Sequence, residues 1–299
     1  MTRIPYPWFI FLAVSLCLTG GEPVKHGVDA NGHRFAVWEK RDSNPHGAVL
    51  LVHGRTWSAL PDFNLSVPGE DLSLMDALVD QGFAVYALDM RGYGATPRDE
   101  SGWLSPHKAA DDVASVVQWI NKHSGLNKKT AVLGWSMGST TSQLAVQRHP
   151  GHVSALILYG YWYNPSKPRP KQEDPENPAR ELNTAKNAAS DFITPNAISQ
   201  KAIDAYVKAS LVADPIRTDW RKLHQFHDLD ATQLKMPVML IHGEDDPFVN
   251  LAAHQLIFSQ LTHADRSWVV LSGGDHAVSL EKPMARFVTA VSGFMKSAL

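Results

Sequence analysis

The sequence that decides how this chain folds is Gly134-Trp135-Ser136-Met137-Gly138. It follows the short apolar run Thr130 to Leu133, and an amphipathic helical pattern continues from Met137 to about Arg148. Gly-x-Ser-x-Gly between a strand and a helix is typical of a sharp turn that exposes a nucleophilic serine. Glycines are needed there because a Cβ on either side would collide with neighbouring backbone. This context favours a nucleophilic Ser136 over a serine that only caps the helix.

Short apolar runs and helical patterns alternate on both sides of this turn. Continuous apolar runs of this kind are typical of strands buried on both faces, as in parallel sheets. The runs are Ala48 to Val52, Ala84 to Leu88, Thr130 to Leu133, Ala155 to Leu158, Val238 to Ile241 and Trp268 to Leu271. The helical patterns are Leu72 to Gln81, Ala109 to His123, Met137 to about Arg148, and Pro283 to the C-terminus. We therefore expect an α/β fold with a mostly parallel sheet.

Two segments depart from this alternation. The turn pair Asn31-Gly32 and the alternating stretch His33 to Trp38 predict an antiparallel edge strand near the N-terminus. The segment between Tyr159 and Lys235 has no strand pattern. It opens with the Pro-rich, charged stretch Asn164 to Pro178, followed by helical patterns over Ala179 to Ser190 and Asn196 to Leu211. We expect residues 161–235 to form a helical cap, and residues 22–160 and 236–299 to form the core domain.

A serine nucleophile needs a base within hydrogen-bond reach, and an acid that orients the base. In this kind of fold both follow the serine in the order acid, then histidine, each after a later strand. The strand at Val238 runs into Glu244-Asp245-Asp246, and the strand ending at Leu271 runs into Gly274-Asp275-His276. The spacing predicts His276 as the base, with an acid in the preceding acidic cluster.

These motifs together resemble the α/β-hydrolase superfamily, in particular its lid-bearing esterase, lipase and lysophospholipase-like branch, over nearly everything after residue 21. The resemblance implies a sheet of about eight strands with a helical cap insertion. It implies Asp246 as the acid, three residues after Gly243, with Asp245 as the competitor. It also implies an oxyanion hole made by the backbone N–H groups of Arg55, after His53-Gly54, and Met137. Asp89 to Gly94 matches a family segment as well, and we interpret Asp89 as a structural residue that fixes a loop.

Several other polar and aromatic residues have two interpretations. The aromatic residues Trp57, Trp135, Tyr161, Trp162 and Tyr163 either line a substrate pocket or pack in the core. His53 and His242 are interpreted as structural residues at strand ends. Asp275 is expected to face outward or to cap its loop.

The function that these residues favour is that of a serine hydrolase acting through an acyl-enzyme. The predicted substrate is a carboxylic ester with a small or medium acyl or aryl group, and the chemistry needs no metal and no organic cofactor. The alternatives are a lactonase, thioesterase, C–C hydrolase or peptidase with the same triad, and a non-catalytic binding protein of the same fold. Serine at the turn argues against haloalkane dehalogenases and epoxide hydrolases, which carry aspartate there.

Composition excludes several other classes of protein. Of the 299 residues, 44% are hydrophobic and 19% are charged, which argues against disorder. The net charge of −2 gives no electrostatic reason to expect nucleic acid or an anionic membrane as a partner. The histidines are scattered, so we expect no tight cluster of metal ligands. The oligomeric state stays open.

The N-terminus has the pattern of a secretory signal peptide. Thr2-Arg3 provides a positive charge, an apolar run extends from Trp8 to Leu18, and small residues follow through Gly21. We therefore expect residues 1–21 to be removed and the mature protein to be secreted or periplasmic, without a membrane span. The alternatives are an uncleaved anchor and a buried N-terminal helix. Cys17 is the only cysteine, so cleavage would leave a chain without disulfides or thiolate sites.

Overall fold

The computed structural model describes residues 21–167, 170–171 and 173–299. The predicted signal peptide lies outside the described residues, apart from Gly21, and stays a prediction. Within the described ranges, none of the helices combines the length and the apolar character needed to cross a membrane.

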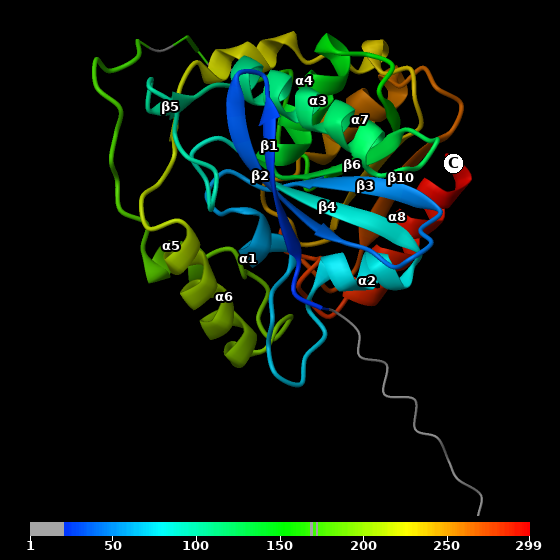
Figure 1. Cartoon of the computed structure of the whole chain (residues 1–299), viewed down its shortest axis with the longest axis horizontal. Coiled ribbons are helices and arrows are strands. Elements are labelled where there is room, and N and C mark those ends of the chain that lie inside the picture. Colours follow the sequence, from blue (N-terminus) through cyan, green and yellow to red (C-terminus); the bar gives the residue numbers. More distant parts are fainter. Residues whose placement is uncertain (1–20, 168–169, 172) are drawn as a thin grey trace, which may run out of the picture.

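An eight-stranded sheet forms the central layer of the molecule (Figure 1). Its strands are β1 (Val24–Ala30), β2 (His33–Lys40), β3 (Gly47–Val52), β4 (Phe83–Asp89), β6 (Thr130–Trp135), β7 (Val153–Tyr159), β9 (Val238–Gly243) and β10 (Arg266–Leu271). Their order is β1-β2-β4-β3-β6-β7-β9-β10. In this order, the strands from β4 to β10 run parallel to one another. β1 pairs antiparallel with β2, and β2 pairs antiparallel with β4. This confirms the mostly parallel α/β-hydrolase sheet.

Both edges of the sheet differ from the sequence prediction. The alternating stretch after Asn31-Gly32 is not the edge, because β1 pairs along the whole outer side of β2. Of the β1 side chains only Val28 is buried, so this strand has almost no apolar pattern to reveal it. At the other edge, β10 is partly exposed and not buried on both faces as its apolar run suggested. Among the described residues, no further strand pairs with the outer side of β10.

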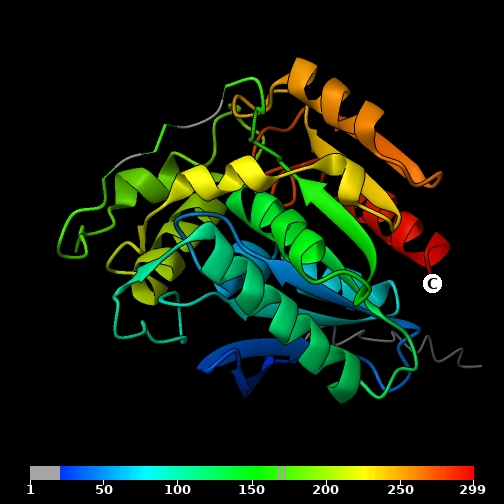
Figure 2. The same ribbon diagram turned by 90° about the horizontal axis from the view of Figure 1, so that it is seen from above.

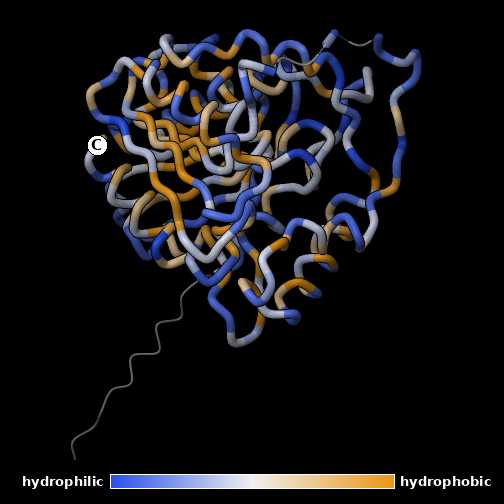
Figure 3. Tube along the Cα trace, turned by 180° about the vertical axis from the view of Figure 1, so that it is seen from behind, coloured by the Kyte–Doolittle hydropathy of each residue, from blue (hydrophilic) through white to orange (hydrophobic). Residues whose placement is uncertain are grey.

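Helices cover both faces of the sheet and enclose two hydrophobic cores. One face packs against α3 (Pro106–His123), α4 (Met137–Arg148) and α7 (Leu251–Gln260), and the other against α2 (Leu74–Asp80) and α8 (Met284–Ser297). Figure 2 shows α3 and α4 lying side by side. Figure 3 shows the hydrophobic segments gathered in the strands between the helices. The helix α7 was not predicted from the sequence, because its apolar residues do not form a clear stripe along one side.

The described part of residues 161–235 contains two α-helices, as expected, together with a short strand and the 3₁₀ helices η1 (Leu223–Asp228) and η2 (Ala231–Gln233), which were not expected. The helices are α5 (Ala185–Ala189), much shorter than its predicted range, and α6 (Gln200–Ala213). The strand β8 (Asp219–Trp220) pairs with β5 (Trp103–Leu104), and such a two-residue strand leaves no periodic signal. Near the lower left of Figure 1, α5 and α6 lie beside α1 (Ala59–Phe63). They bury Tyr206 and Ala188 against Trp57, Leu65 and Leu280 in a third hydrophobic cluster.

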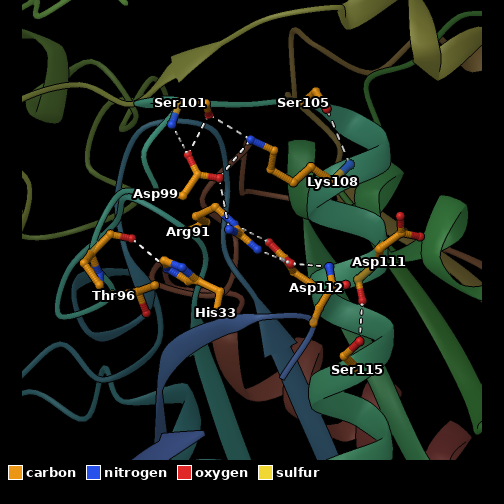
Figure 4. Close-up of polar contacts among 12 residues, drawn as sticks. His33, Arg91, Thr96, Asp99, Ser101, Ser105, Lys108, Asp111, Asp112 and Ser115 are labelled. Atoms are coloured by element: carbon orange, nitrogen blue, oxygen red, sulfur yellow. Dashed lines mark hydrogen bonds and ion pairs between the residues drawn. The ribbon is translucent and has the colours of Figure 1, made fainter. Parts of the chain in front are cut away.

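The loop after β4 is held by buried charges (Figure 4). Asp89 accepts hydrogen bonds from the backbone N–H groups of Ala59 and Ala95 at 3.0 and 2.9 Å, and from Trp38 Nε1 at 2.9 Å. Arg91 donates to both carboxylate oxygens of Asp112, at 3.0 and 2.7 Å. The prediction that Asp89 is a loop-fixing structural residue is confirmed.

Candidate active site

Ser136 occupies a strained turn between β6 and α4. Its backbone angles are φ 55° and ψ −119°, a region that costs a residue other than glycine about 1–3 kcal/mol and is found mostly at functional sites. A Cβ at Gly134 would lie 2.3 Å from the Gly138 carbonyl oxygen, and one at Gly138 would lie 2.2 Å from the Val52 carbonyl oxygen. Only glycine fits on either side, so the sharp turn depends on both residues of the motif.

His276 and Asp246 form a buried pair. Asp246 Oδ2 lies 2.8 Å from His276 Nδ1, and both side chains are at most 6% exposed. The other oxygen of Asp246 accepts a hydrogen bond from the Phe248 N–H at 2.9 Å. Asp245 is exposed, and its backbone N–H donates to the Gly274 carbonyl. Of the two adjacent aspartates, the geometry therefore brings Asp246 to the histidine.

The loop that carries His276 is anchored from the neighbouring strands. The His276 carbonyl oxygen accepts from Trp135 Nε1 and from the Tyr159 hydroxyl, each at 2.8 Å. A Cβ at Gly160, whose φ is +57°, would lie 3.0 Å from His276 Cε1. The imidazole is thus held by its backbone on one side and by close packing against β7 on another.

The loop after β3, residues 54–59, is fixed by three buried carboxylates, one partly buried carboxylate (Asp191) and one tyrosine. Gly54 N donates to Asp62 at 3.4 Å, Ser58 N to Asp214 at 2.8 Å, and Ala59 N to Asp89, while Trp57 Nε1 donates to Asp191 at 2.9 Å. The Tyr93 hydroxyl donates to the Arg55 carbonyl and accepts from Trp220 Nε1 at 2.6 Å. Three of these partners, Asp191, Asp214 and Trp220, belong to segment 161–235. That segment therefore helps to hold the loop in place.

A cavity of about 300 Å³ collects most of the predicted site residues. It is lined by Ser136, His276, Arg55, Met137, Trp57, Trp135 and Trp162 from the sequence prediction, and by Gly54, Thr56, Asp62, Asn187, Ser190, Asp191, Arg217 and Phe248, which the prediction missed. Tyr161 is not among them, since it is buried in the core and its carbonyl accepts from His254 Nε2. A larger cleft of about 870 Å³ lies beside α2 and α8 and contains neither Ser136 nor His276.

His53, His242 and Asp275 are the remaining polar residues for which the sequence suggested a role. His53 is structural, because its Nε2 accepts from the Met90 N–H and burial lowers its pKa to about 3. His242 is structural as well, accepting from Trp268 Nε1 at 3.2 Å. Of the two alternatives expected for Asp275, facing outward is wrong and capping its loop is confirmed. It is fully buried, caps its own loop through the Ala277 N–H, and accepts from the backbone N–H groups of Ile193 and Thr194 in segment 161–235.

Two acids, the buried Asp62 and the partly buried Asp191, lie close together in the wall of the cavity. The Tyr206 hydroxyl lies 2.9 Å from Asp62 Oδ1 and 3.4 Å from Asp191 Oδ2, and its single proton can serve only one of them. Burial raises the pKa of Asp62 well above its ordinary value and that of Asp191 to about 6. Neither acid was predicted, because neither lies in a recognisable motif.

The raised pKa of Asp191 predicts a pH-dependent cost to stability. Between the ordinary aspartate pKa of 3.8 and the folded-state value of about 6, the folded chain binds more protons than the unfolded chain. Stability contributed at this site therefore falls as pH rises through that window. Asp191→Asn removes this titration and keeps a carbonyl oxygen for Trp57.

We expect the free energy of unfolding of Asp191→Asn, relative to the wild type, to increase by about 2 kcal/mol between pH 4.5 and pH 7. Urea unfolding at the two pH values measures it. Asp204→Asn, at an exposed position on α6, is the control and should show no such trend. A relative stability of Asp191→Asn that stays constant with pH would contradict the assignment.

One other group of side chains has the composition of a metal site. His26, Glu39 and His123 come together in the described part of the chain, although they are far apart in sequence, with their ligand atoms within 4.8 Å of one another. The expectation that the histidines form no tight cluster of metal ligands is therefore wrong. None of the three lines the Ser136 cavity.

Comparisons with known proteins identify the family and the fold. Residues 43–283 match the family described as serine aminopeptidase, S33. A monoacylglycerol lipase of Mycolicibacterium smegmatis is 25% identical over 89% of this chain and 93% of its own. Among solved structures, a meta-cleavage product hydrolase from Pseudomonas fluorescens superposes with a TM-score of 0.64 at 17% identity, covering 92% of this chain and 98% of that one. A thermophilic esterase from Thermogutta terrifontis gives 0.60 at 19% identity, covering 93% and 99%.

Proposed function

This chain belongs to the α/β-hydrolase family described as serine aminopeptidase S33, and from that membership we propose that it is a serine esterase. Its substrate is a carboxylic ester with a small or medium acyl or aryl group. The observation that carries the proposal is that His276, paired with the buried Asp246 at 2.8 Å, lines the same cavity as a serine on a strained turn. A buried imidazole that is oriented by a carboxylate can take the proton of a serine hydroxyl.

The proposed reaction proceeds through an acyl-enzyme. His276 accepts the hydroxyl proton of Ser136 as its Oγ attacks the ester carbonyl carbon, and Asp246 stabilises the resulting imidazolium. The backbone N–H groups of Arg55 and Met137 stabilise the oxyanion of the tetrahedral intermediate. His276 then gives its proton to the leaving alcohol. Water, activated by the same histidine, attacks the acyl-serine, and the acid is released.

The fixed loop at residues 54–59 supports this role for Arg55. An oxyanion donor contributes most when it is already in place before charge develops, and one lost donor typically costs 10²–10³-fold in rate. The hydrogen bonds to Gly54, Trp57, Ser58 and Ala59 leave this loop little freedom to reorganise.

An aminopeptidase is the second candidate, because one observation favours it besides the family's description. The carboxyl group of Asp191 lines the same cavity as Ser136 and His276, where it could accept a hydrogen bond from a substrate ammonium group. Asp191 already accepts from Trp57, which is why we place this candidate second.

A substrate panel tests the proposal. We expect labelling by a fluorophosphonate probe and hydrolysis of short and medium p-nitrophenyl esters well above that of lactones, thioesters and aminoacyl p-nitroanilides. Faster turnover of the anilides would favour the aminopeptidase. Labelling without turnover of any ester would reject the esterase, and absence of both labelling and turnover would favour a binding protein.

We infer further that residues 161–235 form a lid that limits the length of the acyl group. Of the residues lining the cavity, Trp162, Asn187, Ser190, Asp191 and Arg217 come from this segment. A cover that is separate from the sheet can vary in shape without disturbing the residues that carry the chemistry. Removing the whole segment would also remove Asp214 and Trp220, which hold the loop at residues 54–59, so a single substitution is the sharper test.

Asn187→Trp should narrow the cavity, because Asn187 is exposed and lines it. We expect kcat/KM for p-nitrophenyl decanoate to fall by about tenfold or more relative to p-nitrophenyl acetate, as poor fit of an acyl chain typically costs 1–3 kcal/mol. Fluorophosphonate labelling should persist. Lys186→Trp, at the exposed neighbouring position outside the cavity lining, is the control. Identical chain-length profiles for the two variants would reject the lid.

A further inference from the structure

A second site lies where the N-terminal hairpin meets the end of α3. His26 is on β1, Glu39 is on β2 and His123 is the last residue of α3. Glu39 Oε2 lies 2.7 Å from His26 Nε2 and 3.5 Å from His123 Nε2. Figures 1 and 2 show the hairpin and α3 lying against each other. Three donor atoms from three separate elements thus converge on one point.

The three ligand atoms lie close enough together to share one metal ion, because all are within 4.8 Å of one another. With metal–ligand bonds of about 2.0–2.1 Å, neighbouring ligand atoms of a tetrahedral centre lie about 3.3 Å apart. The separations of 2.7 and 3.5 Å from Glu39 Oε2 to the two histidine nitrogens fall on either side of that value. A hydrogen bond between His26 and Glu39 explains the shorter distance, whereas a shared ion would also explain why the second imidazole nitrogen faces the same oxygen.

Neighbouring side chains hold Glu39 and His123 in place. The second oxygen of Glu39 accepts from the Tyr86 hydroxyl at 2.8 Å and lies 3.6 Å from Arg41 Nη1, which leaves Oε2 for the histidines. The ring of His123 is stacked on Trp119 with a centroid distance of 4.2 Å. Partners that fix the direction of a side chain in this way are common around metal ligands.

We propose that His26, Glu39 and His123 bind one divalent transition-metal ion of the Zn²⁺ type. Two imidazoles and one carboxylate are a ligand set that Zn²⁺ takes in proteins, with water at the fourth position. His26 and His123 are partly exposed, which leaves room for that water.

The position of this site assigns it a structural role. Glu39 pairs with Tyr86 in the middle of β4. His123 is the last residue of α3, which leads to the start of β6, whereas Ser136 follows the last residue of β6. The proposed metal ligands therefore lie away from the strand ends that carry the Ser136 cavity. A metal there ties the edge strand β1 to α3, and ion binding to the folded state alone raises stability.

Titration of the tag-free full chain with Zn²⁺, followed by calorimetry, tests the proposal. We expect one Zn²⁺ per chain, visible d–d absorption of a tetrahedral complex when Co²⁺ replaces it, and a melting temperature raised by about 5 °C when free Zn²⁺ is about 100-fold above its dissociation constant.

His26→Gln and His123→Gln should each weaken Zn²⁺ binding by roughly 100-fold or more. Loss of a residue that only supports a ligand typically costs about 10–100-fold, and loss of the ligand itself should cost more. Both variants should hydrolyse p-nitrophenyl butyrate like the wild type.

His227→Gln is the matched control, since His227 is an exposed histidine outside the cluster. It should bind Zn²⁺ as the wild type does. Absence of stoichiometric binding to the wild type would overturn the proposal. So would binding that survives in both His26→Gln and His123→Gln, because the ion would then sit elsewhere.

Discussion

Ser136→Ala is expected to lower ester hydrolysis by about 10⁴-fold or more and to abolish labelling by a fluorophosphonate probe. The hydroxyl oxygen is the atom that forms the acyl-enzyme in the proposed reaction, and no other group in the cavity could replace it at the end of the strained turn. The fold should be retained, because alanine at this position carries the same positive φ as serine and fills less space. Circular dichroism and thermal unfolding check the fold, and steady-state kinetics with p-nitrophenyl butyrate check the activity.

Ser142→Ala is the matched control for this experiment. Ser142 lies on α4, is fully buried, and its hydroxyl has no hydrogen-bond partner among the described residues. Its replacement removes a serine hydroxyl from the helix that follows the turn, outside the Ser136 cavity, and activity should be retained. If purified Ser136→Ala kept substantial activity after contamination had been excluded, Ser136 would not be the nucleophile.

Asp246→Asn is expected to reduce kcat by orders of magnitude, up to about 10⁴-fold, with little change in the fold. The aspartate accepts from His276 Nδ1 and thereby leaves Nε2 free to take the serine proton. An asparagine can present its NH₂ group to Nδ1, which selects the wrong tautomer of the imidazole and withdraws the charge that stabilises the imidazolium. Labelling of Ser136 by the fluorophosphonate should slow in parallel with kcat.

Asp245→Asn separates the two adjacent acids. Asp245 is exposed and has no contact with the histidine, so its replacement should change kcat by less than about threefold, as expected of a surface substitution. If Asp245→Asn caused the large loss and Asp246→Asn did not, Asp245 would be the orienting acid. The roles proposed for Ser136 and His276 would be unaffected.

The sequence was sufficient for the sheet, the turn and the order of the site residues. Apolar runs predicted six strands of the sheet because strands buried on both faces leave a continuous signal in the chain. The Ser136 turn was predictable because both glycines belong to one short motif. The requirement at Gly134 is local, since a Cβ there would meet Gly138 and Ser139, whereas a Cβ at Gly138 would meet the end of β3. His276 and an acid in the cluster before it followed from the order of strand ends in this fold, and the resemblance to the family favoured Asp246 within that cluster.

Only the tertiary structure decided which side chains surround that edge. Asp191, Asp214 and Trp220 hold the loop at residues 54–59 across more than a hundred residues of sequence, and no local pattern distinguishes them from other polar or aromatic residues. For Tyr161 the sequence left pocket lining and core packing open, and the structure places its ring in the core. His26, Glu39 and His123 converge for the same reason. Periodicity and turn chemistry are properties of neighbouring residues, whereas these contacts arise when packed helices and strands bring distant segments together.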